Sequence, residues 1–204
     1  MTVRCTVHPT HSRFGREGHR GRRHEAIFRI SVSPCYSNQL VRSAISLSGP
    51  IGVGKTTLGQ ALAGRLSAGF IDGDNLSDPD RPWYCSILQT SKGIVQSGLE
   101  MLRSTPAVVI AYPLGCINWI YFRKKFEDAG AKPLFVTLRA SFPSIVDGGR
   151  GRTFSSVERD RIQVMIAEGY GSRLFSDLVL DTDQADFAGT LAQLERETRR
   201  MITA

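Results

Sequence analysis

One glycine-rich segment has the residue types and the spacing to bind a polyphosphate. Residues 49–56 read Gly-Pro-Ile-Gly-Val-Gly-Lys-Thr, which matches the GxxxxGK[ST] pattern in full. Glycines let the backbone turn so tightly that successive N–H groups point inward at an anion. Lys55 would reach the β- and γ-phosphates of ATP, and the hydroxyl of Thr56 would bind Mg²⁺. The predicted cofactor-binding residues are Gly49, Pro50, Ile51, Gly52, Val53, Gly54, Lys55, Thr56 and Thr57.

The residues on either side of this segment favour a strand before it and a helix after it. Residues 44–48 form a short apolar run, and residues 54–66 place Leu58, Leu62 and Leu66 on one face of a helix. A helix that begins at Gly54 would add its positive N-terminal dipole to the amides of the loop. A chance glycine-rich turn is the alternative, and it would not need this order of elements. A loop of this kind predicts nucleotide binding but not the reaction that follows.

Two carboxylates follow at the end of the next predicted strand, where residues 70–74 read Phe-Ile-Asp-Gly-Asp. Phosphoryl transfer needs a group that orients the attacking hydroxyl and receives its proton. All four histidines precede residue 25, so a carboxylate is the leading candidate in the rest of the chain, and Asp72 is the predicted catalytic residue. Alternatively, Asp72 and Asp74 cap the turn that follows the strand.

A second glycine-rich segment, residues 147–153, carries two arginines, Arg150 and Arg152. Its glycines allow movement, and a guanidinium pairs with phosphate oxygens through two parallel hydrogen bonds. We therefore expect both arginines to act on the nucleotide during catalysis. A solvated surface loop is the alternative.

The rest of the chain alternates predicted strands and helices. Further strands are predicted at residues 69–71, 107–111, 133–138 and 177–180, and further helices at residues 84–102, 118–129, 156–168 and 186–201. Ser155 and Glu158 stand at capping-box spacing at the start of one of these helices. Apolar strands that alternate with helices predict an α/β fold with a five-stranded parallel sheet and helices on both faces.

The charge of the chain is concentrated at its N-terminal end. The net charge is +7, and residues 1–43 hold eight arginines against two glutamates. We therefore predict a basic, disordered leader at residues 1–43, before a domain at residues 44–204 that has no reason to bind nucleic acid. A misplaced start, a targeting peptide and a genuine basic tail are three open interpretations of the leader.

The cysteines and the apolar runs of the sequence bear on the cellular compartment of the protein. The four cysteines have no CxxC spacing, which favours a reducing, cytoplasmic protein. No apolar run approaches the length of about 18 residues that a membrane-spanning helix needs.

The acidic segment resembles that of the shikimate and gluconate kinases. The Asp-Gly-Asp sequence at residues 72–74 is similar to their DxD segment, and residues 80–83, Asp-Arg-Pro-Trp, are similar to a segment of gluconate kinases. The resemblance implies the strand order 2-3-1-4-5. It also implies that Asp72 lies near Mg²⁺ and the attacking hydroxyl, and that Asp72, Asp74 and Arg81 contact the acceptor. In these kinases, the segment that corresponds to residues 147–153 here, with Arg150 and Arg152, is a lid that closes over ATP.

The chain also departs from this family. Shikimate kinases carry three glycines after the third strand, where residues 111–115 here read Ala-Tyr-Pro-Leu-Gly. No arginine on the second helix matches their substrate-reading residue, although Arg103 lies near its end, and the third strand lacks an aspartate. These departures leave the acceptor open.

The expected function is that of an ATP-dependent small-molecule kinase with a shikimate- or gluconate-like acceptor, acting as a monomer or a dimer. The absence of an NKxD sequence argues against a GTPase. A nucleotide or nucleoside kinase and a non-catalytic ATP-binding regulator are the two alternatives.

Overall fold

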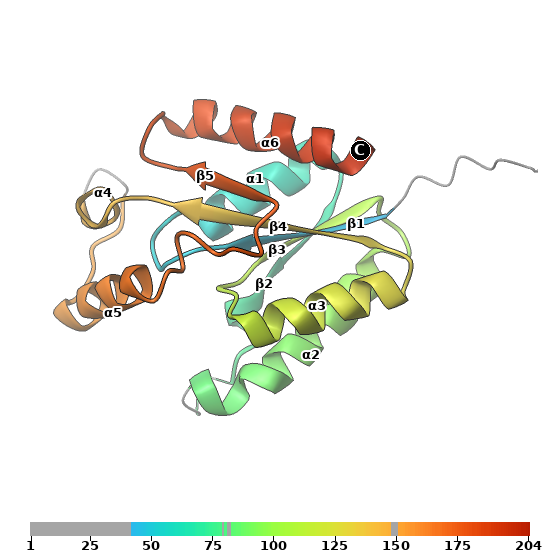
Figure 1. Cartoon of the computed structure of the whole chain (residues 1–204), viewed down its shortest axis with the longest axis horizontal. Coiled ribbons are helices and arrows are strands. Elements are labelled where there is room, and N and C mark those ends of the chain that lie inside the picture. The colour runs from blue at the N-terminus through green and yellow to red at the C-terminus, as the bar shows by residue number, and fades with distance from the viewer. Residues whose placement is uncertain (1–41, 79, 81–82, 148–150) are drawn as a thin grey trace, which may run out of the picture. The chain divides into compact units, whose positions relative to one another are not determined.

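The computed structural model describes residues 42–78, 80, 83–147 and 151–204, without the side chains of residues 83–85 (Figure 1). The predicted leader lies outside the described residues as far as residue 41. Two predicted site residues, Arg81 and Arg150, also lie outside them, so their roles stay predictions.

Five parallel strands form one sheet, as the sequence predicts. The strands are β1 (Ser43–Ser48), β2 (Gly69–Asp72), β3 (Ala107–Ala111), β4 (Lys132–Arg139) and β5 (Leu178–Asp181). Their order is β2-β3-β1-β4-β5, with every neighbouring pair parallel, which confirms the order 2-3-1-4-5. The central strands β1 and β3 are buried along their whole length, because helices cover both faces of the sheet.

Six α-helices and one 3₁₀ helix accompany the strands within the described residues. They are α1 (Lys55–Leu66), η1 (Gly73–Leu76), α2 (Trp83–Met101), α3 (Cys116–Asp128), α4 (Phe142–Val146), α5 (Ser156–Ala167) and α6 (Phe187–Thr203). In Figure 1, α1 and α6 cover one face of the sheet and α2 and α3 cover the other. Helices α4 and α5 lie beyond the arrowheads of β4 and β5, so they stand at the edge of the sheet where parallel α/β folds bind ligands.

Alternate residues of the strands feed two separate hydrophobic clusters. From β3, Val109 joins the cluster beneath α1 and α6, whereas Val108 and Ile110 join the cluster beneath α2 and α3. Successive side chains of a strand point to opposite faces, so β1, β3 and β4 each contribute to both clusters. In the second cluster Phe122 and Phe126 of α3 are fully buried, and their rings meet edge to face.

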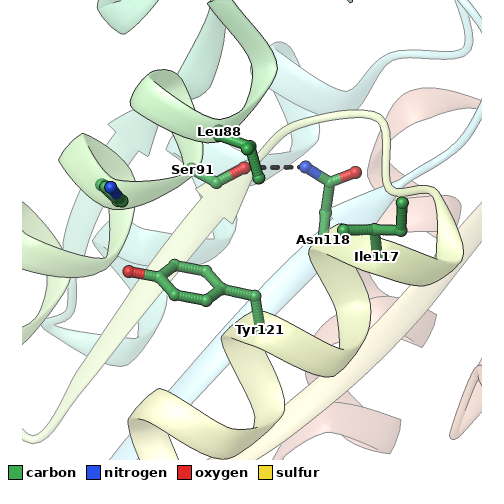
Figure 2. A pocket seen from close by; sticks show the side chains of 6 residues that line it. Leu88, Ser91, Ile117, Asn118 and Tyr121 are labelled. Atoms are coloured by element: carbon green, nitrogen blue, oxygen red, sulfur yellow. Dashed lines mark hydrogen bonds between the residues drawn. The ribbon is translucent and has the colours of Figure 1, made fainter.

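A polar contact also holds the two helices of the second layer together. The side-chain amide of Asn118 in α3 donates to the hydroxyl of Ser91 in α2 over 2.7 Å, and that hydroxyl donates to the backbone carbonyl of Ile87 (Figure 2). A pocket of about 20 Å³ lies beside this contact. That volume holds about one water molecule, so the pocket is a packing feature of the two helices.

Two short helices, η1 and α4, are absent from the sequence-based prediction. Segments of four or five residues show no hydrophobic period, so periodicity cannot reveal them. The signal for α4 is local, because Ser141 caps the helix and Pro143 lies in its first turn. Within the described residues, no helix has both the length and the apolar character needed to span a membrane.

Candidate active site

The glycine-rich loop leaves the carboxyl end of β1 and turns directly into α1. Gly49 and Gly52 have φ angles of 142° and 78°, which lie in a region that favours glycine. A Cβ atom on Gly52 would lie 2.6 Å from the ring of Phe154, so the loop also needs glycine for this close packing. No side chain caps α1, because its cap residue is Gly54. The first amides of the helix are therefore free of side-chain partners, as an anion site requires.

A cavity of about 720 Å³ opens over this loop. It is lined by the loop and the start of α1, by Asp74, by α4, by the segment around Arg152, and by the residues that join β5 to α6. Its volume suits a nucleotide. Of the predicted site residues, it gathers Ile51, Gly52, Val53, Gly54, Lys55, Thr56, Thr57, Asp74 and Arg152. Gly49, Pro50 and Asp72 lie next to these in the structure but are not part of the cavity wall.

The ammonium group of Lys55 lies inside the turn of the loop. Its Nζ donates to the backbone carbonyls of Gly49 at 3.0 Å and Pro50 at 2.8 Å. Burial lowers the pKa of Lys55 to about 8, although the nearby carboxylates of Asp74 and Asp72 partly oppose this by favouring the charged form. A cation with little solvation at the base of a cavity is a strong attractor of phosphate charge.

Thr56 and Asp72 are brought together from different elements. The hydroxyl of Thr56, on α1, donates to Oδ2 of Asp72, at the end of β2, over 2.9 Å. The other carboxylate oxygen of Asp72 accepts from the backbone N–H of Asp74 and so caps η1. The two interpretations of Asp72 are therefore compatible, since one oxygen serves the turn and the other reaches the phosphate-binding loop.

The Thr56–Asp72 pair also fits the ligand preferences of Mg²⁺. This ion takes one or two protein oxygens and completes its shell with waters and substrate phosphates. Over the described residues, no three His, Cys, Asp or Glu side chains gather to hold a metal ion. A metal ion at this site would therefore complete its coordination shell with waters and phosphate oxygens.

Asp74 projects into the cavity from η1. Burial raises the pKa of Asp74, the Lys55 ammonium lowers it, and the neighbouring Asp72 carboxylate raises it. The residue between the two acids has its own structural role, because a Cβ on Gly73 would lie 2.4 Å from the ring of Tyr112. Tyr112, which follows β3, thus packs directly against the acidic segment. In the sequence this position is only a departure from three glycines, and its contact with Gly73 depends on how β3 and η1 meet in the fold.

Arg152 also lines the cavity, close enough to Lys55 and Asp74 to interact electrostatically with both. Its Nη2 donates to Oε1 of Glu158 over 2.8 Å, and its guanidinium lies 4.8 Å from the centre of the Phe154 ring. Glu158 also completes the predicted capping box with Ser155, which confirms the start of α5. Arg152 is thus exposed to solvent yet lines the cavity, held by a ring that packs on the phosphate-binding loop.

The wall formed by the β5–α6 connection is tied to the loop and to α4. Thr182 donates its hydroxyl to the backbone carbonyl of Val53 over 3.2 Å. Asp183 accepts from the backbone N–H of Ser141, the cap of α4, and this hydrogen bond lowers the pKa of Asp183 to about 2. These hydrogen bonds connect the β5–α6 segment to the phosphate-binding loop and to the start of α4.

Three residues near the carboxyl ends of the strands lie away from the cavity. Arg139, at the end of β4, forms two hydrogen bonds of 2.6 and 2.8 Å with the carboxylate of Asp181. Trp119 stacks on Phe175 with ring centres 5.1 Å apart, and Cys116 is exposed. None of the three belongs to the cavity wall.

Several solved structures with a similar fold are described as kinases of small molecules. A gluconokinase from Sinorhizobium meliloti 1021 matches with a TM-score of 0.54 at 22% identity, over 79% of this chain and 91% of that one. A sugar kinase from Janibacter sp. HTCC2649 matches with a TM-score of 0.58 at 14% identity, over 77% and 92% of the two chains. An APS kinase from Mycobacterium tuberculosis, in complex with AMPPNP and APS, matches with a TM-score of 0.55 at 15% identity, over 80% and 99%. No protein-family model and no curated protein sequence matches this chain.

The sheet order, the glycine-rich loop and these structural neighbours define the fold as that of the P-loop small-molecule kinases. At these identities the similarity establishes the fold alone.

Proposed function

We propose that this protein is an ATP-dependent kinase that transfers the γ-phosphoryl group to a hydroxyl of a small metabolite. The observation that carries the proposal is the hydrogen bond between Thr56 and Asp72, because it joins the phosphate-binding loop to the acidic segment at the edge of the cavity. A nucleotide-binding module without chemistry would need the loop but not this second carboxylate-bearing segment.

In the proposed reaction, the loop amides and Lys55 bind the phosphate chain. Lys55 exchanges its two contacts with loop carbonyls for phosphate oxygens, which restores the solvation of its charge. Thr56 and Asp72 would hold Mg²⁺, which when bound offsets the negative charge that builds on the transferred group. The protein thus supplies position and positive charge to a reaction that needs little else.

The two aspartates divide the work on the acceptor in this proposal. Asp72 orients the attacking hydroxyl beside the metal site, and Asp74 contacts the acceptor from the cavity wall. Burial raises the pKa of Asp74, which favours it as a group that receives a proton, because a carboxylate with a raised pKa binds a proton more firmly.

Arg152 supplies the remaining charge. From its place on the cavity wall, it needs to leave only Glu158 to reach a phosphate oxygen. Arg150 is proposed for the same role from the sequence alone.

The test is ADP release by the full-length protein, with Mg-ATP and a panel of sugar acids, cyclitols and nucleoside monophosphates as acceptors. We expect turnover that depends on one hydroxylated small metabolite and disappears in Lys55→Met. Turnover with a nucleoside monophosphate alone would identify a nucleotide kinase. Tight ATP binding without turnover on any acceptor would instead support a regulator and contradict the proposal.

A further inference from the structure

One aromatic ring connects the phosphate-binding loop to the side chain of Arg152. A Cβ atom on Gly52 would lie 2.6 Å from Cζ of Phe154, so the tip of this ring touches the loop. The Arg152 guanidinium lies over the same ring, 4.8 Å from its centre. Phe154 is only 7% exposed and belongs to the hydrophobic cluster beneath α1 and α6. The ring therefore joins a solvent-exposed arginine to the core.

The position of Phe154 is fixed by the fold and needs no bound ligand. Ile145 of α4 approaches the same point of Gly52, so the ring, α4 and the loop meet there. The Nε of Arg159 donates to the backbone carbonyl of Phe154 over 3.3 Å. The next residue, Ser155, begins the capping box of α5. Both the side chain and the backbone of Phe154 are thus held before any nucleotide arrives.

Arg152 needs such support because its own side chain is long and open to solvent. The side chain is 58% exposed, and its single ion pair among the described residues is with Glu158. An unsupported arginine would occupy many rotamers, and ordering it costs conformational entropy. On the ring, its charge already interacts electrostatically with Lys55 and Asp74. The ring thus places the guanidinium near the loop in advance.

The geometry points to Phe154 as a positioning residue that holds the Arg152 guanidinium beside the phosphate-binding loop. A cation over an aromatic face is attracted by the ring itself, and this contact leaves the N–H groups of the guanidinium available. Arg152 can therefore exchange Glu158 for a phosphate oxygen while it stays on the ring. The inference rests on the proposed function, because Arg152 acts only when a phosphoryl group is transferred.

A double-mutant cycle tests whether Phe154 acts through Arg152. ADP release is measured for the wild-type protein, Phe154→Leu, Arg152→Ala and the double variant, with Mg-ATP and the panel acceptor that gives the fastest turnover. Phe154→Leu keeps apolar bulk without a ring and should lower kcat by about three- to tenfold. In the Arg152→Ala background the same change should lower kcat by less than about twofold, because no guanidinium is left to position.

A second measurement separates this role from simple support of the loop. Isothermal titration calorimetry measures the binding of Mg-ADP, and its affinity for Phe154→Leu should stay within about twofold of wild type because the loop amides and Lys55 remain. Phe142→Leu is the matched control. Phe142, on α4, packs on the same cluster but is not part of the cavity wall, so its kcat should not change.

Urea unfolding checks that each variant is folded. If Phe154→Leu is unfolded, Phe154→Met replaces it in the cycle, because methionine fills irregular space in a core without a ring.

The outcomes distinguish the inference from the function on which it rests. An unchanged kcat in the folded Phe154 variant, or losses that add fully in the double variant, would overturn the positioning role. A loss of Mg-ADP affinity as large as the loss of kcat would overturn it too, since the ring would then support the loop and not Arg152. A wild-type protein without turnover on any acceptor would overturn the proposed function, and the positioning role with it.

Discussion

The hydroxyl of Thr56, on α1, and the carboxylate of Asp72, at the end of β2, lie 2.9 Å apart, although β3 separates β2 from β1, the strand that leads into α1. The same carboxylate accepts from the backbone N–H of Asp74 at 3.1 Å. Asp72 thus fixes the acidic segment relative to the phosphate-binding loop from both of its oxygens.

Replacing Asp72 by Asn tests this arrangement. Its remaining carbonyl oxygen can still cap η1, so the free energy of unfolding should change by less than about 1 kcal/mol. The loss of charge should lower phosphotransfer by roughly 10² to 10⁴-fold, the usual contribution of a proton-handling or orienting group. The measurements are steady-state kinetics and urea unfolding, with the exposed Asp128→Asn on α3 as control. Wild-type turnover in Asp72→Asn would remove Asp72 from the mechanism.

The lowered pKa of Lys55 predicts proton uptake when a nucleotide binds. In the free protein Lys55 loses its proton near pH 8, and phosphate charge should raise its pKa again. At about pH 8.5 to 9, binding of Mg-ADP should therefore take up a fraction of a proton, and affinity should fall as the pH rises. Calorimetry in two buffers of different ionisation enthalpy measures this uptake.

Lys55→Arg is the matched control, because a guanidinium keeps its charge throughout this range and should show no linked proton. Equal uptake by both proteins would assign the proton to another group.

The lowered pKa of Lys55 also makes the stability of the fold depend on pH. Between about pH 8 and 10.5 the unfolded chain binds this proton more firmly than the folded chain does. The contribution of Lys55 to the free energy of unfolding therefore increases as the pH rises through this range.

Arg152 and Glu158 can be separated by two conservative changes. Arg152→Lys keeps the charge but loses the planar fork, and it should lower the rate of phosphotransfer by about tenfold or more. Glu158→Gln removes the ion pair while glutamine still suits a capping box, so the rate should stay within about threefold. An equal loss in both variants would mean that the ion pair, and not contact with phosphate, is what Arg152 contributes.

The packing of Gly73 against Tyr112 predicts a steric penalty. A methyl group at residue 73 would lie 2.4 Å from the Tyr112 ring and 2.8 Å from Ile94, so Gly73→Ala should destabilise the fold by about 1 to 3 kcal/mol. In contrast, Gly64→Ala on α1 meets no atom within 4 Å and should stabilise the fold by up to about 1 kcal/mol. Urea unfolding compares the two, and equal stabilities would contradict this account of the acidic segment.

The sequence predicted the strands well because each is a short run rich in apolar residues. The predicted range of β3 is the observed one, and that of β1 differs by one residue. The phosphate-binding loop was equally accessible, since a contiguous motif fixes its own geometry. These features depend on neighbouring residues, and local pattern is enough to predict them.

Other features depend on how distant segments meet. Arg139 and Asp181 are paired in the register of β4 and β5, which places their side chains in an ion pair. Sequence spacing contains no information on that register. The contacts of Gly73 with Tyr112 and of Gly52 with Phe154 likewise exist only once the sheet order is known.

The phosphate-binding loop and the acidic segment pack on different hydrophobic clusters. Val53, Leu58 and Phe154, beside the phosphate-binding loop, belong to the cluster under α1 and α6. Tyr112 and Ile94, which support the acidic segment, belong to the cluster under α2 and α3. In the proposed kinase, amino-acid changes in the α2–α3 layer should therefore alter the preference for an acceptor while the binding of the phosphoryl donor is retained. Selection for new acceptors should accumulate its substitutions on that layer.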